Sequence, residues 1–440
     1  MNAVAENNIN SKTAWLGEFP THWDVLRIKN IATINDEALS EKTASDFLIK
    51  YIDIGNVNSD GEINEIQGFN FSDAPSRARR ILRRGDVIIS TVRTYLKAIT
   101  QISFEVDNHI ASTGFAVLRP KKNITSDFLG YAVKAKYFID SIMANSFGVS
   151  YPAINSSTLA TLTILVPPKN EQDEIVQYIK AQEEKINLFI QKKQRFIELL
   201  KEQRQIVIHQ VVTKGLNQKV KLKSSGIEWL GDIPTHWEIR RLKECLIGKL
   251  KYGANESGEE YNPTWYRYIR ITDFSLDGKL SEENKLSLSP EIGAEYALQD
   301  GDILFARSGA TVGKTFQFNY VSEEEKYCYA GYLIKATPNK NIILSDFLFN
   351  YTNSKAFENW KNSIFNKATI ENIGADKYSV LKIPIPPIEE QKQIVSHIKT
   401  ETATIDTAIL KAEREIELIR EYKEAMISEA VMGKRQLAYE

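Results

Sequence analysis

The chain has 440 residues, of which 42% are hydrophobic and 26% charged, and its formal net charge is −1. This length predicts more than one domain, and the near-zero charge excludes a protein coated in positive charge while permitting local basic faces. No apolar run approaches the roughly 20 residues of a membrane-spanning helix, and the polar N-terminal segment lacks the apolar core of a signal peptide. Two cysteines, Cys245 and Cys328, without metal-ligand spacing, favour a cytoplasmic protein without a disulfide framework.

The first 168 residues mix short β-type runs with turn signals. Strands are predicted at 49–54, 86–90, 115–118 and 162–166, and Asp60-Gly61 marks a tight turn between such runs. A helix is predicted over 126–142, with Ser126 and Asp127 at cap positions. This part of the chain is therefore expected to be α+β.

A long helix follows. Pro167 and Pro168 suit a helix start, and the stretch 171–213 contains neither glycine nor proline. Apolar residues recur there at spacings of three, four or seven, a pattern typical of a coiled coil. They are Ile175, Ile179, Ile186, Phe189, Phe196, Leu200 and Val207.

The second half repeats the first, anchor by anchor. The segments that recur in the same order are WLGEFPTHW from Trp15 and WLGDIPTHW from Trp229, YIDIGNVNSDGEI at 51–63 and YIRITDFSLDGKL at 268–280, Gly85-Asp86 and Gly301-Asp302, DFLGYAVKAKYF from Asp127 and DFLFNYTNSKAF from Asp346, and VPPKNEQDEIVQYIK from Val166 and IPPIEEQKQIVSHIK from Ile385. The chain is therefore predicted to be a tandem duplication of a unit of about 215–220 residues.

The second unit carries the same predicted elements. Asp277-Gly278 repeats the turn signal, and helices are predicted over 345–364 and 390–432. The apolar stripe of the second long helix consists of Ile394, Ile398, Ile405, Ile409, Ala412, Ile416 and Ile419. Two helices of matched length with narrow apolar stripes are expected to pair with each other rather than to lie alone on a surface.

Motifs for catalysis fall short of their templates. The segment from Ser308 to Thr315 approaches a P-loop, but Ser308 stands where the first glycine belongs, and the matching region from Ser90 has no glycine. A Gly-rich loop beside DNA or a turn fits better than a nucleotide site. The neighbours of the Pro-Pro pairs differ from the adenine methyltransferase motif. His22 and His236 are expected to pack beside Trp23 and Trp237, because no second metal ligand is spaced to join them.

Basic and aromatic residues gather in several loops. Five arginines lie between Arg77 and Arg84, and arginines alternate with aromatic residues from Trp265 to Arg270. Such a set is typical of nucleic-acid contact, although a solvated surface explains any single residue equally well. The candidate DNA-contacting residues are Arg77, Arg79, Arg80, Arg83, Arg84, Arg93, Lys97, Tyr266, Arg267, Arg270, Arg307, Ser308, Lys314 and Lys367.

The duplicated W-L-G-x-x-P-x-x-W start, the Gly-Asp segment and the Pro-Pro-x-x-Glu-Gln start of the long helix resemble the type I restriction–modification specificity subunit. The Glu-Gln pairs at 171–172 and 390–391 are the most specific part of the resemblance, which extends from Trp15 to about Lys434. It implies target recognition domains at 1–168 and 216–387, spacer helices at 169–215 and 388–434, and a tail at 435–440. The two helices would pair as an antiparallel coiled coil.

The resemblance also implies a function without catalysis by this chain. Each target recognition domain would contact one half of a split site in double-stranded DNA. Two DNA methyltransferase subunits would dock on the chain and restriction subunits would join them, bringing S-adenosylmethionine, ATP and Mg²⁺. No metal or cofactor is expected on the chain itself. Two alternatives stay open: a coiled-coil scaffold or adaptor without a DNA role, and a fused nucleotide hydrolase that uses Lys314.

Overall fold

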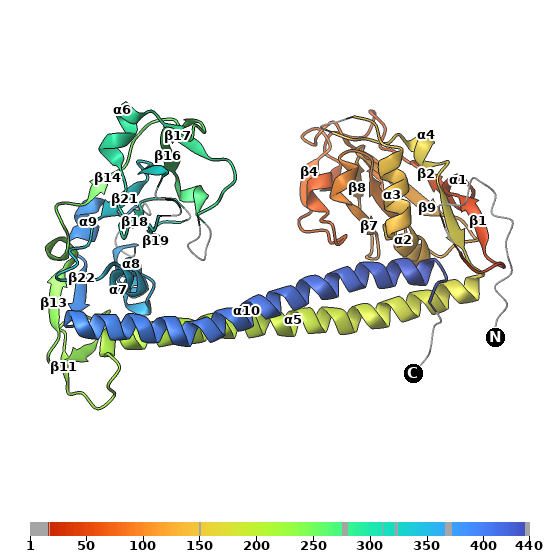
Figure 1. The fold of residues 1–440 in the computed structure, drawn as a ribbon. Helices are drawn as coiled ribbons and strands as arrows, with labels where there is room; N and C mark the ends of the chain where they lie inside the picture. Colours follow the sequence, from red (N-terminus) through yellow and green to blue (C-terminus); the bar gives the residue numbers. More distant parts are fainter. Residues whose placement is uncertain are drawn as a thin grey trace. The chain divides into compact units, whose positions relative to one another are not determined.

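The structure, a computed structural model, describes residues 16, 18–148, 151–274, 280–309, 311–320, 322, 324–365 and 372–435. Trp15, the turn signal at Asp277-Gly278, Lys367 and residues 436–440 of the predicted tail lie outside the described residues. The chain forms two compact units (Figure 1). The first consists of Met1–Lys193 with Arg414–Glu440, and the second of Gln194–Glu413. Each unit therefore contains one α+β part and a portion of both long helices.

The first unit contains three small sheets. A β-ribbon pairs β1 (Asp24–Arg27) with β10 (Thr163–Val166). One four-stranded sheet has the order β2-β9-β6-β7, and the other has the order β4-β3-β8-β5, in which β3 and β8 run parallel. The strands of these two sheets are β2 (Ala32–Ile34), β3 (Leu48–Ile52), β4 (Gln67–Asn70), β5 (Ala78–Ile81), β6 (Val87–Ser90), β7 (Ile99–Gln101), β8 (His109–Ser112) and β9 (Phe115–Pro120).

The predicted strands of this unit are present, with one shortened. The strand expected over 49–54 ends at Ile52, because the backbone N–H of Asp53 donates to the Asn56 side chain at 2.8 Å and a 3₁₀ turn, η2 (Ile54–Asn56), begins. The remaining short helices of the unit are α1 (Ile28–Ile31), η3 (Thr94–Leu96) and α4 (Ser156–Leu159).

The helix predicted over 126–142 is two helices. They are α2 (Ser126–Lys134) and α3 (Lys136–Ala144), and between them Ala135 is extended, with φ −63° and ψ 141°. The N-cap of α2 is Thr125 rather than Ser126; its side chain accepts a hydrogen bond from the N–H of Phe128. The break lets both helices bury apolar faces, with Phe128 on α2 and Phe138 on α3 both fully buried in one core.

The second unit repeats this plan. A ribbon of β13 (Glu238–Arg241) and β22 (Lys382–Ile385) matches β1 and β10. Four-stranded sheets have the orders β14-β21-β18-β19 and β15-β17-β16-β20, and the parallel pair is β16 and β20. Their strands are β14 (Lys251–Tyr252), β15 (Glu259–Glu260), β16 (Tyr266–Ile269), β17 (Leu286–Leu288), β18 (Ile303–Ala306), β19 (Thr315–Gln317), β20 (Lys326–Tyr329) and β21 (Leu333–Ala336). A hairpin of β11 (Leu222–Ser224) and β12 (Asp232–Pro234) is added.

The helix predicted over 345–364 is divided as well, into α7 (Ser345–Thr352) and α8 (Lys355–Phe365). At Asn353 the backbone leaves the helical region, and the Asn353 side chain donates to the carbonyl of Phe349 at 2.8 Å. The short helices of this unit are η4 (Leu242–Cys245), η5 (Ile271–Asp273), α6 (Pro290–Gly293), η6 (Ala294–Tyr296) and α9 (Ala375–Ser379).

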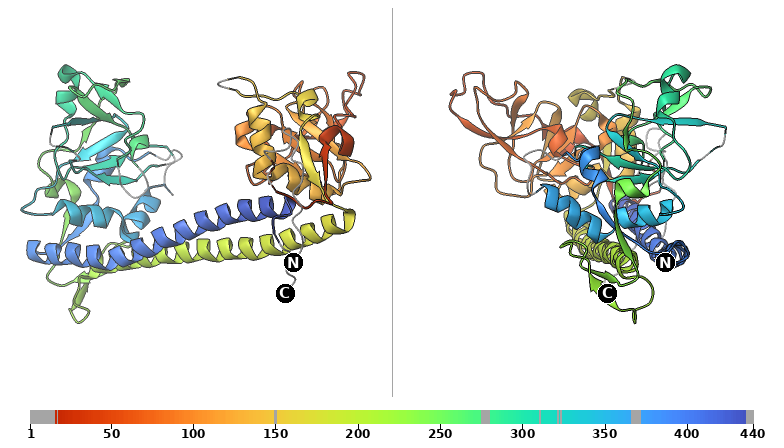
Figure 2. Two further views of the ribbon diagram at one scale, coloured as in Figure 1. Left: turned by 45° about the vertical axis from the view of Figure 1, so that its right-hand side comes forward. Right: turned by 90° about the vertical axis from the view of Figure 1, so that its left-hand side faces the viewer.

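The long helices are α5 (Lys169–Lys214) and α10 (Ile388–Val431), and they pair as an antiparallel coiled coil (Figures 1 and 2). In the first unit, Lys423 forms an ion pair with Glu183 at 3.2 Å, and Lys193 forms one with Glu415. In the second unit, Arg204 binds Asp406 at 2.9 Å. Residues of α5 from Glu183 to Arg204 pair with residues of α10 from Lys423 back to Asp406, so the two helices run in opposite directions.

The ends of the long helices bury apolar residues against the globular part of each unit. Two members of the predicted stripe of α5, Phe189 and Phe196, are instead 37% and 45% exposed. In the first unit, Ile175 and Ile179 of α5 and Met426 and Val431 of α10 belong to the same core as the sheet and α2. In the second, Ile208 and Val212 share a core with Ile394 and Trp237. The helix pair is thus part of each domain core. Within the described residues, no helix combines the length and apolar character needed to cross a bilayer.

Candidate nucleic-acid interface

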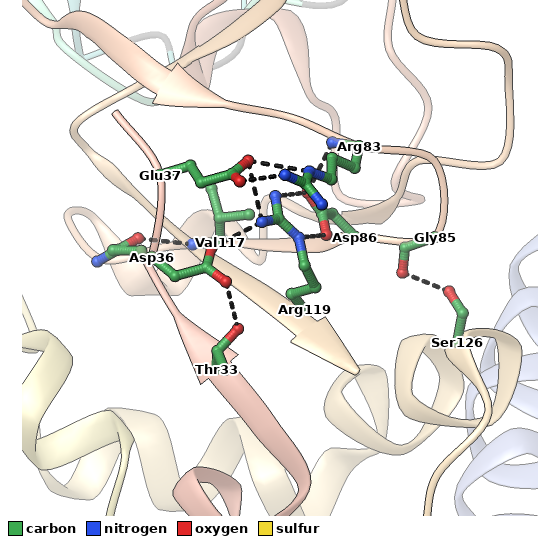
Figure 3. A network of polar contacts seen from close by, with 10 residues as sticks. Thr33, Asp36, Glu37, Arg83, Gly85, Asp86, Val117, Arg119 and Ser126 are labelled. Carbon is green, nitrogen blue, oxygen red and sulfur yellow. Dashed lines mark hydrogen bonds and ion pairs between the residues drawn. The ribbon is translucent and has the colours of Figure 1, made fainter. Parts of the chain in front are cut away.

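The Gly-Asp segment fixes the start of β6. Gly85 has φ +91°, a left-handed conformation that favours glycine, and its carbonyl accepts a hydrogen bond from the hydroxyl of Ser126. The carboxylate of Asp86 is 1% exposed and accepts from both Nε and Nη2 of Arg119 at 2.9 Å (Figure 3). This bidentate bond is the main cause that raises the pKa of Arg119. The network is an anchor for the strand.

The second unit anchors β18 with different partners. Gly301 has φ +88°, and Asp302 accepts hydrogen bonds from the hydroxyl of Thr337 at 2.6 Å and the N–H of Gln299 at 2.8 Å. Lys335 lies 3.7 Å from the same carboxylate. The repeated Gly-Asp motif therefore serves the fold in both units, and it fixes where the opposite end of each strand emerges.

The loops that leave β6 and β18 share an unusual backbone. Arg93 and Lys97 have φ +50° and +53°, and the corresponding positions of the second unit are Gly309 and Gly313, with φ +78° and +79°. Left-handed conformations cost a residue with a side chain roughly 1–2 kcal/mol, whereas glycine adopts them freely. The glycine spacing that resembled a P-loop is thus explained by the two left-handed positions of this loop, which the first unit fills with basic residues.

In the first unit this loop presents an exposed aromatic and basic surface. The guanidinium of Arg93 lies over the ring of Tyr151, 4.9 Å from its centroid. Tyr151 is 64% exposed, and Phe147 and Tyr95 beside this loop are exposed as well. Lys97 reaches Glu424 of α10 at 3.7 Å. The contact between Arg93 and Tyr151 is a cation–π pair on the protein surface.

The loop after β18 carries a similar pair. Arg307 lies over the ring of Tyr252 of β14, 5.1 Å from its centroid, and the hydroxyl of Tyr252 accepts a hydrogen bond from the N–H of Ala375 at 2.9 Å. The pair borders a hollow of about 430 Å³. The other residues that line the hollow are Gly253, Asn255, Ser308, Gly331, Tyr332 and Asn372.

The arginine-rich segment of the first unit is spread over several surroundings. Arg77 is exposed, and Arg79 lies over the ring of Phe71 at 4.9 Å. Arg80 is half-buried, and burial lowers its pKa. Arg83 is paired with Glu37, and Arg84 with Glu105, both at the surface. These residues lie along β5 and the segments on either side of it. The carbonyl of Arg77 accepts a hydrogen bond from the N–H of Thr113 at 2.8 Å, next to Gly114, whose carbonyl accepts from Thr91 at the exit of β6.

The aromatic and arginine segment of the second unit lies mostly inside the fold. Arg267 is 3% exposed and binds Glu282 at 2.9 Å and Glu325 at 3.6 Å. Arg270 binds Asp273 at 2.7 Å, and the same carboxylate accepts a hydrogen bond from the backbone N–H of Arg270 at 2.8 Å at the start of η5. Tyr266 lies beneath Lys326, at 5.7 Å. Arg267 and Arg270 therefore hold this sheet together.

Lys314 borders a separate hollow that also contains Thr315, Lys361 and Gln205 of α5. Lys314 is half-buried and lies two residues after Val312, at the end of the loop between β18 and β19. The structure thus brings Arg307 and Ser308 together in one hollow and leaves Lys314 in another.

The Glu-Gln pairs connect each long helix to its globular part. Glu171 accepts a hydrogen bond from Trp23 Nε1 at 2.9 Å, and His22 Nε2 lies within hydrogen-bond distance of its carboxylate at 2.8 Å. Glu390 makes the same contacts with Trp237 at 3.1 Å and His236 at 2.8 Å. Both histidines are therefore structural partners of a carboxylate beside a tryptophan.

Sequence reasoning missed the aromatic partners of the two loops, Tyr151 and Tyr252, and the exposed Tyr332. Tyr151 lies 58 positions after Arg93 in the chain, so no local spacing joins them. The positive charge on loops after predicted strands was the available signal, and it identified the arginines and lysines but not these tyrosines. Among the described residues, no group of three or more His, Cys, Asp or Glu side chains is placed to hold a metal ion.

Two globular parts that share a β-ribbon, a four-stranded antiparallel sheet and a parallel strand pair in a second sheet define a duplicated two-domain protein. Residues 20–199 and 234–418 match the family described as type I restriction modification DNA specificity domain. The chain belongs to this family.

Relatives and solved structures extend the similarity over nearly the whole chain. The putative type I restriction enzyme MjaX specificity subunit of Methanocaldococcus jannaschii is 25% identical and is covered over 96% of its length, with 97% of this chain. The EcoKI specificity subunit of Escherichia coli is 21% identical over 72% of this chain and 67% of its own. A chain from a structural study of the assembly and conformational transition of the type I R-M system has a TM-score of 0.70 at 22% identity, covering 95% of this chain and 100% of that one, and shares its fold.

Proposed function

We propose that this chain is the DNA sequence-specificity subunit of a type I restriction–modification complex, in which each unit contacts one half of a split target in double-stranded DNA. One observation carries the proposal. The family match covers both units, and each unit presents an arginine on a tyrosine ring at the exit of the same strand. A protein with two similar domains suits a bipartite DNA site, and domains that have diverged suit half-sites of different sequence.

The proposal includes the partners of the chain. Two DNA methyltransferase subunits and the restriction subunits would assemble on it, and they would hold S-adenosylmethionine, ATP and Mg²⁺. The chain itself would bind no cofactor and catalyse no reaction, and it would act in the cytoplasm. A net charge of −1 supports partner subunits that supply many of the phosphate contacts, because DNA affinity depends strongly on neutralised phosphates.

The candidate DNA contacts become fewer in this proposal. Arg267 and Arg270 are assigned to the fold, because carboxylates hold both of them and their side chains are only 3% and 32% exposed. Arg83 and Arg84 are also paired, but their side chains are 60% and 64% exposed and stay available to DNA. Lys367 lies outside the described residues and stays a prediction. The remaining proposed contacts are Arg77, Arg79, Arg80, Arg83, Arg84, Arg93, Lys97, Tyr266, Arg307, Ser308 and Lys314.

The test is methylome sequencing of cells that express the chain with its cognate methyltransferase. A methylated, interrupted sequence that appears only with both proteins is expected. Replacing residues 15–168 by the corresponding part of another specificity subunit should then change one half of that sequence. A complex that binds no DNA, even at low salt, would favour the coiled-coil scaffold instead, whereas two altered halves would contradict independent domains.

A further inference from the structure

Five cations of the candidate set have a carboxylate partner. Arg83, Arg84, Lys97, Arg267 and Arg270 each bind an acidic side chain. Arg79, Arg93 and Arg307 instead lie over aromatic rings, and within the described part of the chain no ion pair joins any of the three to a carboxylate. Arg79 lies within β5 and donates to the carbonyl of Ala78, whereas Arg93 and Arg307 follow the corresponding strands β6 and β18.

The loop geometry indicates that the side chain of Arg93 serves a purpose. Position 93 is left-handed, and the second unit has Gly309 at the corresponding place. A strained residue persists where the surrounding structure enforces it, and such residues gather at functional sites. The loop of the first unit therefore keeps a left-handed residue where glycine would remove the backbone strain. That residue is an arginine, whose side chain lies at the surface over the ring of Tyr151.

A guanidinium held over a ring face is restricted in its rotation, and its N–H donors stay available to a ligand. This geometry suits the O6 and N7 acceptors on the major-groove edge of guanine, which take two parallel hydrogen bonds from arginine. In the second unit, the amides of Asn255 and Asn372 line the same hollow as Arg307 and add donors and acceptors beside it. A phosphate also accepts two parallel hydrogen bonds from arginine, so the experiment below distinguishes a base contact from a phosphate contact by sequence discrimination and by salt dependence.

We infer that Arg93 and Arg307 are the base-contacting arginines of the first and second units, each recognising the major-groove edge of a guanine in its own half of the target. Tyr151 and Tyr252 act as positioning residues that hold the guanidinium planes. This inference rests on the proposed function, because it presupposes a bipartite DNA target.

The experiment compares methylomes of the complex with the wild-type chain and with Arg93→Gln or Arg307→Gln. Each substitution should remove the preference for guanine at one position of one half-site, a loss of roughly 5- to 150-fold in discrimination, and leave the other half-site unchanged. Tyr151→Phe should preserve the discrimination that Tyr151→Ala weakens. Arg435→Gln is the matched control, because Arg435 also lies over tyrosine rings, Tyr178 and Tyr422, at the end of α10.

For a variant that no longer methylates DNA, a DNA-binding assay with competitor duplexes tests the same inference. For the variant complex, the wild-type target duplex is compared with competitor duplexes in which each base pair is replaced in turn. The replaced and wild-type duplexes should compete equally only at the position that the arginine contacted, as expected for a lost base contact. Variants that methylate the wild-type sequence with unchanged discrimination would overturn the inference. So would a uniform loss of affinity for every duplex with a reduced salt slope, because that marks a phosphate contact. If the wild-type complex itself methylates no interrupted sequence, the proposed function fails first.

Discussion

The backbone N–H of Thr125 donates a 2.8 Å hydrogen bond to Oε1 of Gln172, and this bond links the N-cap of α2 to the start of α5. The amide nitrogen of Gln172 in turn donates to the carbonyls of Pro167 at 2.8 Å and Asn123 at 3.1 Å. Gln391 repeats all three bonds with Leu344, Pro386 and Ile342, and both glutamines are fully buried. One amide thus satisfies three backbone groups where a helix, a loop and a strand end meet.

Gln172→Leu should destabilise the first unit. It removes one acceptor and two donors from buried backbone groups, and each unsatisfied group costs about 1–3 kcal/mol. We expect a loss of at least about 2 kcal/mol in the free energy of unfolding, measured by urea denaturation. Gln191→Leu on the exposed face of α5 is the control and should have little effect. Equal stability of the two variants would show that the hydrogen bonds of Gln172 contribute nothing net.

Asp86→Ala should cost more than the loss of a surface ion pair. The side chain of Arg119 is 17% exposed, so removal of its bidentate partner leaves a largely buried charge with Asp36 and Glu37 alone. A loss of about 3 kcal/mol is expected, whereas Asp140→Ala, which removes the exposed pair with Lys136, should cost less than about 1 kcal/mol. Thermal or urea unfolding of the two variants measures the difference. Similar losses would contradict a buried role for the Asp86 network.

The stability of the first unit should fall in mild acid because of His109. Burial lowers the pKa of His109 below its usual 6.5, and Lys50 lowers it further, while Asp107 opposes both. The unfolded chain therefore takes up a proton as the pH falls through about 6.5, whereas the folded unit does so only at lower pH. Stability is consequently lost as the pH falls from about 6.5 toward the folded pKa.

His109→Asn should flatten this dependence, because asparagine offers an acceptor in place of Nδ1 to the N–H of Asp107 but takes up no proton. Melting temperatures between pH 7 and 5 measure the slope. His397→Asn on α10 controls for removal of a histidine as such. A wild-type slope that persists in His109→Asn would assign the acid sensitivity to another group.

A matched pair of heptad insertions should lengthen the helix pair without changing its packing. An inserted heptad keeps the apolar stripe in register and adds about 10 Å of helix, the length of roughly three base pairs of DNA. Insertions after Arg195 and Arg414 fit the observed pairing, in which Lys193 contacts Glu415. The double insertion should preserve both half-site sequences and lengthen the interval between them in the methylome.

A single insertion after Arg195 should reduce or abolish methylation, because α10 then lacks seven residues of matching stripe. The informative comparison is between single and double insertions in the same complex. An active double insertion with an unchanged interval would show that the helices do not set the distance between half-sites.

Local patterns predicted much of the framework. The duplication, the long helices and the strand positions all depend on periodicity and on order along the chain, which are visible in the sequence. The breaks at Ala135 and Asn353 were missed because neither position carries a glycine or proline. There the apolar faces of two short helices bury better than one straight helix, and that preference depends on the tertiary packing.

The candidate site was predicted less well, for a related reason. Arg267 stands among aromatic residues, which suggested a DNA-facing surface, but Glu282 and Glu325 come from other elements and neutralise it in the interior. Whether an arginine is free depends on such distant partners. Arg93 and Arg307 were identified by their place after a strand, and their tyrosines only by the structure.

Strand β6 places two kinds of residue at its two ends. Asp86, which anchors the fold, precedes the four residues of the strand, and Arg93 follows three positions beyond it. A change at the exit therefore leaves the buried network of Asp86 and Arg119 intact. Natural proteins have little stability to spare, so substitutions confined to the exit are tolerated where those at the anchor are not. If Arg93 contacts a base as proposed, a lineage of such proteins can acquire new DNA targets while retaining one inherited scaffold.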